Sequence, residues 1–206
     1  QVWAEPGRAY RIRELLGERE KFVESDLFDI QHDEFIQRFV PYQALLIDAL
    51  DARPDLPGSA ETADMIRSWD GRASADTLAV PIVSAFRRSA LESAKIALLE
   101  RMRIPNTGAD PSTMRLAAMA MNEAPVLAAI QSQDPDLLPA DHPGWASILD
   151  QATTDAIDAG LKNGDTPWAE RNRGLFQHPL GQAHPLVGST FDLPRVPQPG
   201  HWGAVR

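Results

Sequence analysis

Residues 77–102 read TLAVPIVSAFRRSALESAKIALLERM, the longest stretch of the chain with a single helical period. Apolar side chains recur along it every three or four residues, at Leu78, Ile82, Phe86, Ala90, Ala94 and Ala97. This spacing places them on one face of an α-helix. Pro81 fits poorly inside a helix, so the helix either begins near Leu78 or has a distorted first turn. The stretch predicts one long helix at the centre of a mainly α fold.

The sequence before this helix also has helical patterns. RAYRIRELLGE, residues 8–18, carries a short apolar stripe and reaches a stop at Gly17. Residues 24–52 continue a helical stripe for which Ser25 is a suitable N-cap, and Pro41 is expected to kink or restart that helix. Ser59 can cap a further short helix that leads to Trp69.

The sequence WDGRASADT at residues 69–77 separates two of the predicted helices. Trp69 is expected to fill the core at a helix end. Asp70 can accept hydrogen bonds from backbone N–H groups in the turn, and Gly71 can adopt a positive φ. The stretch is therefore interpreted as a turn that directs the long helix, rather than as an active-site loop.

The sequence after the long helix is less regular. Residues 111–133 predict two short helices broken at Pro125, and residues 144–164 predict one more helix that ends at Asn163 and Gly164. From Asp165 onward the chain is rich in proline, glycine and histidine and has no long period. The predicted organisation is a helical segment at 1–164 and an irregular tail at 165–206 that packs on that segment or on parts outside the sequence.

Composition excludes several classes of function. The net charge is −9 and the pI is near 5.0, with no dominant basic patch, so nucleic acid is not an expected partner. The chain has no cysteine, which excludes disulfides and thiolate metal sites. No apolar run approaches the roughly 20 residues of a membrane helix. The sequence opens on Gln1 without an apolar leader, from which we expect a piece of a longer protein.

The histidines do not form a recognisable metal site or catalytic relay. His178 and His184 are separated by prolines and a glycine in a spacing that matches no standard zinc pattern. His32 precedes Asp33 on a predicted helix, where adjacent side chains point apart. All three are interpreted as structural, and no cofactor is expected to bind this segment.

Four motifs in order resemble the penicillin acylase family of N-terminal nucleophile hydrolases. They are RAYRIRELL, ESDLFDIQHDEFIQRFVPYQALLIDAL, SWDGRASADTLAVPIVSAFRRSAL, and a later tryptophan followed by FQHPLGQAHPL. The resemblance is to the helical part of the large β subunit. It implies an irregular helical layer of a larger αββα hydrolase that cleaves the acyl amide of N-acylated small molecules. It also implies a periplasmic or secreted enzyme, with calcium possible in the intact family member.

The resemblance also implies which catalytic groups this chain lacks. In the family a serine at the start of the β subunit attacks the amide carbonyl, and its own α-amino group is the base. An asparagine upstream of the RAYRI motif helps to hold the oxyanion. Gln1 has no nucleophilic hydroxyl, so the isolated chain is predicted to be inactive. The expected partner is the missing N-terminal part of the precursor, namely the α subunit and the start of the β subunit.

One arginine is carried over from the family to this chain. The family places an arginine near the active site at the start of the helix, and this position corresponds to Arg8, with Arg11 as the alternative if the register slips. A guanidinium suits the role because it stays charged and can orient an asparagine or a substrate carboxylate.

A second class of function stays open at this point. The chain could instead be a non-catalytic helical module whose acidic surface and proline-rich tail bind a protein partner. If a large part of the protein is missing, the segment should expose an unusually large apolar patch. The candidates for that patch are Phe35, Phe39, Trp168, Phe176 and Trp202.

Overall fold

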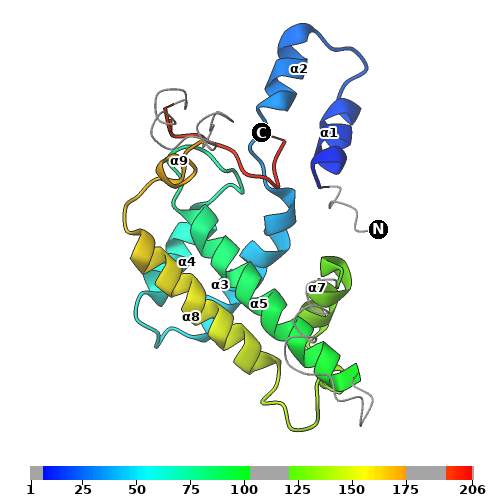
Figure 1. The fold of residues 1–206 in the computed structure, drawn as a ribbon, viewed down its shortest axis with the longest axis vertical. Coiled ribbons are helices and arrows are strands. Elements are labelled where there is room, and N and C mark those ends of the chain that lie inside the picture. The colour runs from blue at the N-terminus through cyan, green and yellow to red at the C-terminus, as the bar shows by residue number, and fades with distance from the viewer. Residues whose placement is uncertain (1–6, 103–120, 175–193, 206) are drawn as a thin grey trace, which may run out of the picture. The chain divides into compact units, whose positions relative to one another are not determined.

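A computed structural model describes residues 7–102, 121–174 and 194–205. The fold is mainly α, as predicted, and the described residues contain no strand beyond a single antiparallel bridge between Phe35 and Arg72. None of their helices is long and apolar enough to cross a membrane. The helices in Figure 1 are α1 (Gly7–Gly17), α2 (Glu24–Gln31), η1 (Gln37–Phe39), α3 (Val40–Ala52), α4 (Ser59–Ser68), α5 (Ala79–Met102), α7 (Glu123–Ser132), η2 (Pro135–Leu137), α8 (Trp145–Asn163) and α9 (Trp168–Arg171).

The chain forms two compact units that are discontinuous in sequence. The first, called here the helical unit, contains Phe39–Ser68 and Pro81–Asn163. The second, called the terminal unit, contains Glu5–Arg38, Trp69–Val80 and Gly164–Arg206. Each unit therefore gathers segments that lie far apart in the sequence.

The long helix α5 confirms the central sequence prediction. It begins at Ala79, whose backbone N–H donates to Thr77 Oγ1 at 3.3 Å, and Pro81 lies in its first turn. A proline is tolerated there because the first N–H groups of a helix have no partner within the helix. Five of the six predicted stripe residues, from Ile82 to Ala97, are buried, and Phe86 is fully enclosed.

Helices α3, α4, α5 and α8 form the core of the helical unit (Figure 1). Small residues let these helices approach closely. A Cβ added at Gly160 of α8 would lie 3.3 Å from Ile82 Cδ1 of α5, and one added at Gly58, just before α4, would lie 3.2 Å from Ile157 Cγ2. The buried apolar residues of α8 include Ile148, Ala152, Ala156 and Ile157, whereas Leu161 near its end is exposed. The helix ends at Asn163, as expected.

The predicted continuous stripe over residues 24–52 is wrong in one respect. Helix α2 ends at Gln31, and α3 restarts at Val40 with Pro41 in its first turn. If α2 continued past Gln31, Glu34 would lie on the same face as Leu27 and Ile30. A charged residue on this apolar face explains why the helix is interrupted between Gln31 and Val40. The N-cap of α2 is Val23 rather than Ser25, and the backbone N–H of Val23 donates to Asp26 Oδ2 at 3.0 Å.

Other local expectations are also corrected. Ser59 is the first residue of α4, and its hydroxyl donates to the Leu50 carbonyl instead of accepting from α4. Pro125 lies in the first turn of α7 and does not break that helix. Phe39 is buried, so it does not belong to an exposed patch. Among its described residues, the tail contains one helical turn, α9. The first of the two helices predicted around Pro125 lies outside the described residues.

In the terminal unit, the stretch after Trp69 is hydrogen-bonded on both sides. Towards residues 34–36, Ile36 N–H donates to Gly71 C=O at 2.8 Å and Ala73 N–H donates to Glu34 C=O at 2.9 Å. Towards the C-terminal segment, Gly200 N–H donates to Ala73 C=O at 2.8 Å. The interpretation of this stretch as a structural turn holds for Trp69, Asp70 and Gly71: the first is buried, the second accepts from Arg72 N–H, and the third has φ +80°.

A side chain at Gly71 would be unfavourable for two reasons. A Cβ added there would lie 2.7 Å from Phe35 Cε2, and its φ of +80° disfavours any L residue. We expect Gly71→Ala to lower the free energy of unfolding by about 2–4 kcal/mol, from the positive φ and the forced displacement of the ring. Urea unfolding of the two proteins measures this change.

Gly164→Ala is the matched control for this prediction. Gly164 also has a positive φ, of +53°, but no atom lies within 4 Å of its added Cβ. We therefore expect only the backbone cost, about 1–2 kcal/mol. Equal losses at Gly71 and Gly164 would show that the Phe35 ring does not constrain the turn.

Candidate functional site

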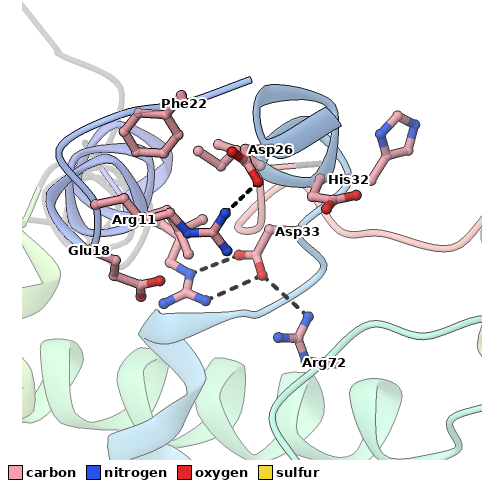
Figure 2. Close-up of a pocket in the computed structure, with 11 residues that line it drawn as sticks. Arg11, Glu18, Phe22, Asp26, His32, Asp33 and Arg72 are labelled. Atoms are coloured by element: carbon pink, nitrogen blue, oxygen red, sulfur yellow. Dashed lines mark hydrogen bonds and ion pairs between the residues drawn. The ribbon is translucent and has the colours of Figure 1, made fainter. Parts of the chain in front are cut away.

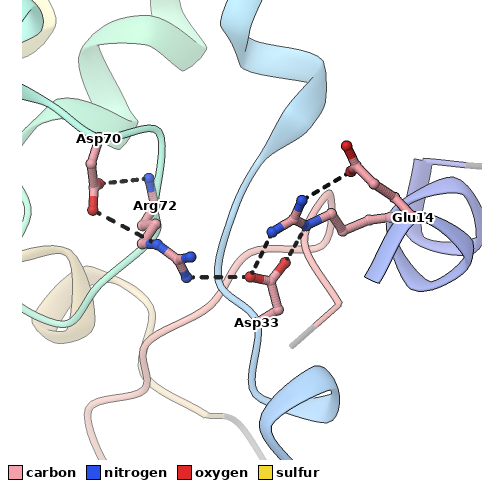
Figure 3. A network of polar contacts seen from close by, with 5 residues as sticks. Glu14, Asp33, Asp70 and Arg72 are labelled. Atoms are coloured by element: carbon pink, nitrogen blue, oxygen red, sulfur yellow. Dashed lines mark hydrogen bonds and ion pairs between the residues drawn. The ribbon is translucent and has the colours of Figure 1, made fainter. Parts of the chain in front are cut away.

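A buried carboxylate in the terminal unit binds two arginines from distant parts of the sequence (Figure 3). Asp33 Oδ2 accepts from Arg11 Nε at 2.8 Å, and its Oδ1 accepts from Arg11 Nη2 at 3.3 Å. The same Oδ1 accepts from Arg72 Nη1 at 3.2 Å. Asp33 therefore binds Arg11 in a bidentate manner and Arg72 through a single bond.

Two further carboxylates extend this arrangement at its ends. Glu14 Oε2 accepts from Arg11 Nη1 at 2.9 Å, and Asp70 Oδ2 lies 3.8 Å from Arg72 Nε. The order Glu14, Arg11, Asp33, Arg72, Asp70 alternates in charge along its whole length (Figure 3). We call these five residues the charge network. Because every neighbour is of opposite sign, each contact is attractive.

The five members of the network come from three segments of the chain. Helix α1 carries Arg11 and Glu14 one turn apart on the same face. Asp33 follows the end of α2, where the chain becomes extended. Arg72 follows Gly71 in the turn. Trp69 Nε1 donates to the Arg72 carbonyl at 2.8 Å, and this hydrogen bond fixes the backbone of Arg72. The network thus joins three segments of the terminal unit.

Burial makes the central pair the most constrained part of the network. The side chain of Asp33 is 6% exposed and that of Arg11 is 14% exposed. The hydrogen bond to Asp33 raises the pKa of Arg11 above its ordinary value, against the opposing effect of desolvation. The guanidinium also lies over the Phe35 ring, 4.9 Å from its centroid. Removing either charge would leave the other buried without its partner, which is strongly unfavourable.

A polar cavity of about 420 Å³ opens beside the network (Figure 2). Most of the side chains that line it are polar, and the charged ones include both acids and arginines. A smaller, apolar part of the lining comes from α1, α2 and the loop between them. Arg19 binds Asp26 across the cavity, and the pKa of Asp26 is lowered by the backbone N–H of Val23 and by Arg19. The lining residues are Arg11, Leu15, Glu18, Arg19, Phe22, Asp26, Asp29, Ile30, His32, Asp33 and Arg72.

The charges of this cavity limit what it can bind. Its acidic side chains outnumber its arginines, so the lining does not favour an anion. Among the described residues, no group of three or more acidic or histidine side chains is arranged to hold a metal ion. The chemistry available at the site is therefore that of a fixed guanidinium, which can donate hydrogen bonds to a neutral or negative oxygen.

The two arginines predicted for the site differ in their surroundings. Arg8 is exposed, and its Nε donates to the backbone carbonyl of Trp202 at 2.9 Å. Arg11 is the arginine that the structure places in the charge network. His32 lines the cavity, but its Nδ1 lies 2.8 Å from the Phe28 carbonyl, and Figure 2 shows its ring directed away from Asp33.

The remaining predicted residues are distributed as follows. Trp202 is 59% exposed, and the guanidinium of Arg38 lies 4.2 Å from the centroid of its ring. Phe35 and Trp168 are half-buried. Gln1, Phe176, His178 and His184 lie outside the described residues.

Sequence reasoning missed Asp33 and Arg72 as members of a site. Asp33 was considered only as a neighbour of His32, and Arg72 only as part of a turn. Their contacts join residues 22 and 39 positions apart, which no helical period reveals. The sequence contained one signal for Asp33, namely the break in helical phase after Ile30. This break indicates that Asp33 lies in the segment after α2 and not on the helix itself.

A family model described as penicillin amidase matches residues 1–206, the full length of the sequence. No curated protein matches the sequence.

Proposed function

Because the chain belongs to the penicillin amidase family, we propose that it is the helical portion of the β subunit of an enzyme that cleaves the acyl amide of N-acylated small molecules. The match of the family model to the whole sequence carries this proposal. The resemblance of four motifs in order supports it, since they are spread over residues 8–186 of the chain.

The proposed reaction is acyl transfer from nitrogen to a serine and then to water. The serine hydroxyl attacks the amide carbonyl while its own α-amino group takes the proton, and the amine leaves with a proton. Water then cleaves the acyl ester, releasing the acid and restoring the serine. The nucleophile and the oxyanion asparagine belong to the missing N-terminal part of the precursor, which is the proposed partner of this chain.

Exposed apolar side chains on α1 and α2 support a partner at this surface. Neither helix buries a single residue, whereas every described helix from α3 to α8 with eight or more residues does. A concentration of large apolar groups on the surface marks an interaction site. Those with high exposure are Tyr10, Leu16, Val23, Leu27 and Phe28.

Within this chain, we assign the supporting role to Arg11 rather than Arg8. The bidentate contact with Asp33 and the low exposure of Arg11 hold its guanidinium in one orientation, which a group that stabilises a reacting partner requires. Arg8 has one hydrogen bond to a backbone oxygen and an exposed side chain. We propose no cofactor for this segment, and a periplasmic or secreted location for the intact protein, in which calcium could bind elsewhere.

The test is hydrolysis by the intact, matured precursor. A panel of N-acyl amides with aromatic, short and long acyl groups is incubated with the enzyme, and the released amine is measured. We expect turnover of at least one member and loss of activity when the proposed serine is replaced by alanine. A matured protein that releases no amine from any member would contradict the proposal and favour a non-catalytic helical module.

A further inference from the structure

The way in which Arg11 is held has a feature that packing alone does not explain. Its helix, α1, has no buried residue, so apolar contacts do not fix the orientation of this side chain. A long arginine side chain loses much of its rotamer freedom when it is fixed. The contacts that fix the guanidinium of Arg11 are those with Asp33 and Glu14, together with the ring of Phe35.

Asp33 is better suited than Glu14 to set this orientation. Glu14 is half exposed and lies one turn away on the same helix, so it moves with Arg11. Asp33 is buried and comes from a different segment, so it defines the position of Arg11 relative to the rest of the terminal unit. Its two oxygens accept from Nε and Nη2, a paired contact that admits one orientation of the planar guanidinium.

Arg72 completes the arrangement by holding Asp33 on its other side. It donates from Nη1 to Asp33 Oδ1 at 3.2 Å, and the bridge between Phe35 and Arg72 fixes the two backbones next to each other. Three of the five N–H donors of Arg11 are used by Asp33 and Glu14. The other two are free of these acids, and Arg11 lines the cavity of Figure 2.

We infer that Asp33 is the positioning residue that orients Arg11 for amide hydrolysis, and that Arg72 fixes Asp33 in turn. This inference rests on the proposed function of Arg11. Asp33 and Arg72 act through the guanidinium and touch no reacting atom themselves. Asp33 and Arg72 then have a role in catalysis in addition to their role in stabilising the fold.

Kinetics of the intact, matured enzyme test this inference first. Asp33→Asn keeps the shape of the side chain but removes its charge, and we expect kcat/KM to fall about 100-fold, because a displacement of about 1 Å in a positioned group can cost that much. Arg11→Lys is expected to lose a similar factor, since an ammonium cannot make the paired contact. Asp33→Glu keeps the charge, so its kcat/KM should be higher than that of Asp33→Asn and lower than that of the unaltered enzyme. A kcat/KM for Asp33→Asn within twofold of the unaltered enzyme would overturn the inference.

The matched control is Glu123→Gln. Glu123 is also a partly buried acid paired with an arginine, Arg87, but it lies in the helical unit and outside the charge network. At a temperature where the variants are folded, we expect its kcat/KM to stay within about twofold of the unaltered enzyme. An equal loss in Glu123→Gln and Asp33→Asn would mean that loss of any buried acid lowers activity, and would overturn a specific role for Asp33.

Chemical rescue provides a readout that a merely structural role would not move. The Arg11→Ala variant lacks the guanidinium of residue 11 but keeps that of Arg72. Asp33 should bind added methylguanidinium in the place of the lost group. We expect this ion to restore part of the activity of Arg11→Ala and to have no such effect on Arg11→Ala/Asp33→Asn. Rescue of both variants to the same extent would contradict the inference.

Binding of the ion separates this inference from the proposed function. Saturation-transfer NMR on the intact protein should detect methylguanidinium bound to Arg11→Ala and not to Arg11→Ala/Asp33→Asn, whether or not any amide is cleaved. Inactivity of the unaltered enzyme would defeat the proposed function. Equal binding to the two variants would defeat the assignment of Asp33. If Arg11→Ala does not fold, the loss expected in Arg11→Lys decides the kinetic part.

Discussion

Purified on its own, the 206-residue chain is expected to release no amine from N-acylated substrates above the rate of the buffer. In the proposed mechanism the serine, its α-amino group and the oxyanion donors act together. In serine hydrolases that form an acyl-enzyme, loss of the nucleophile alone lowers kcat about 10⁶-fold. Loss of an oxyanion donor lowers it about 10²- to 10³-fold. Neither Arg8 nor Arg11 can replace the serine, because a protonated guanidinium is not a nucleophile. Fluorescent detection of released amine measures the rate.

The control for this experiment is the intact precursor, matured and assayed at the same molar concentration. It should be active while the isolated chain is not. The contrary result would be amine release by the isolated chain that disappears after heating but persists in Arg8→Ala and Arg11→Ala. Such activity would require a second active site within these 206 residues and would overturn the proposed division of catalytic groups.

Removal of the Glu123 side chain is expected to be the most destabilising single substitution proposed for this chain. Glu123, in the first turn of α7, accepts from Tyr42 Oη and from Arg87 Nε, both at 2.8 Å, and also pairs with Arg87 Nη2. Its side chain is 13% exposed. Glu123→Ala would leave the partly buried Arg87 guanidinium and the Tyr42 hydroxyl without this acceptor, and we expect a loss of about 3–5 kcal/mol in the free energy of unfolding.

Urea unfolding followed by circular dichroism measures this loss, and Glu61→Ala is its control. Glu61 lies in the first turn of α4, as Glu123 does in α7, but it is exposed. The control loses a favourable charge at a helix N-terminus, which is worth about 0.3–1 kcal/mol. A Glu123→Ala variant no less stable than Glu61→Ala would show that the buried pair contributes little beyond its position in the helix.

Short-range patterns accounted for much of the fold. The stripe from Ile82 to Ala97 predicted α5, and its start at Ala79 follows from the position of Pro81. The turn sequence after Trp69 allows a positive φ at Gly71, and Gly71 has one. In each case the residues that decide the structure lie within a few positions of one another. The errors at Ser25 and Pro125 are boundary errors of one or two residues, where several local arrangements have similar energies.

The candidate site was not predictable in the same way. Whether Arg11 or Arg8 points into the terminal unit depends on the location of Asp33, and that depends on the end of α2 at Gln31. The pairing of Asp33 with Arg72 further depends on the hydrogen bonds of Ile36 and Ala73 across the turn. Each step joins residues that are distant in sequence, so the charge network becomes visible only when the chain is folded.

The hydrogen bond between Gly200 N–H and the Ala73 carbonyl has a consequence for the order in which the protein folds as it is synthesised. About 130 residues separate these partners, which at ribosomal rates of about 5–20 residues per second amounts to an interval on the order of 10 s. During that time Ala73 has left the ribosome while Gly200 has not yet been made. The described helices from α3 to α8 can form within this interval. The turn that carries Arg72, in contrast, must wait for the last residues of the chain before its backbone is satisfied on both sides, so we expect a nascent chain stalled before Gly200 to be cleaved by proteases near Ala73.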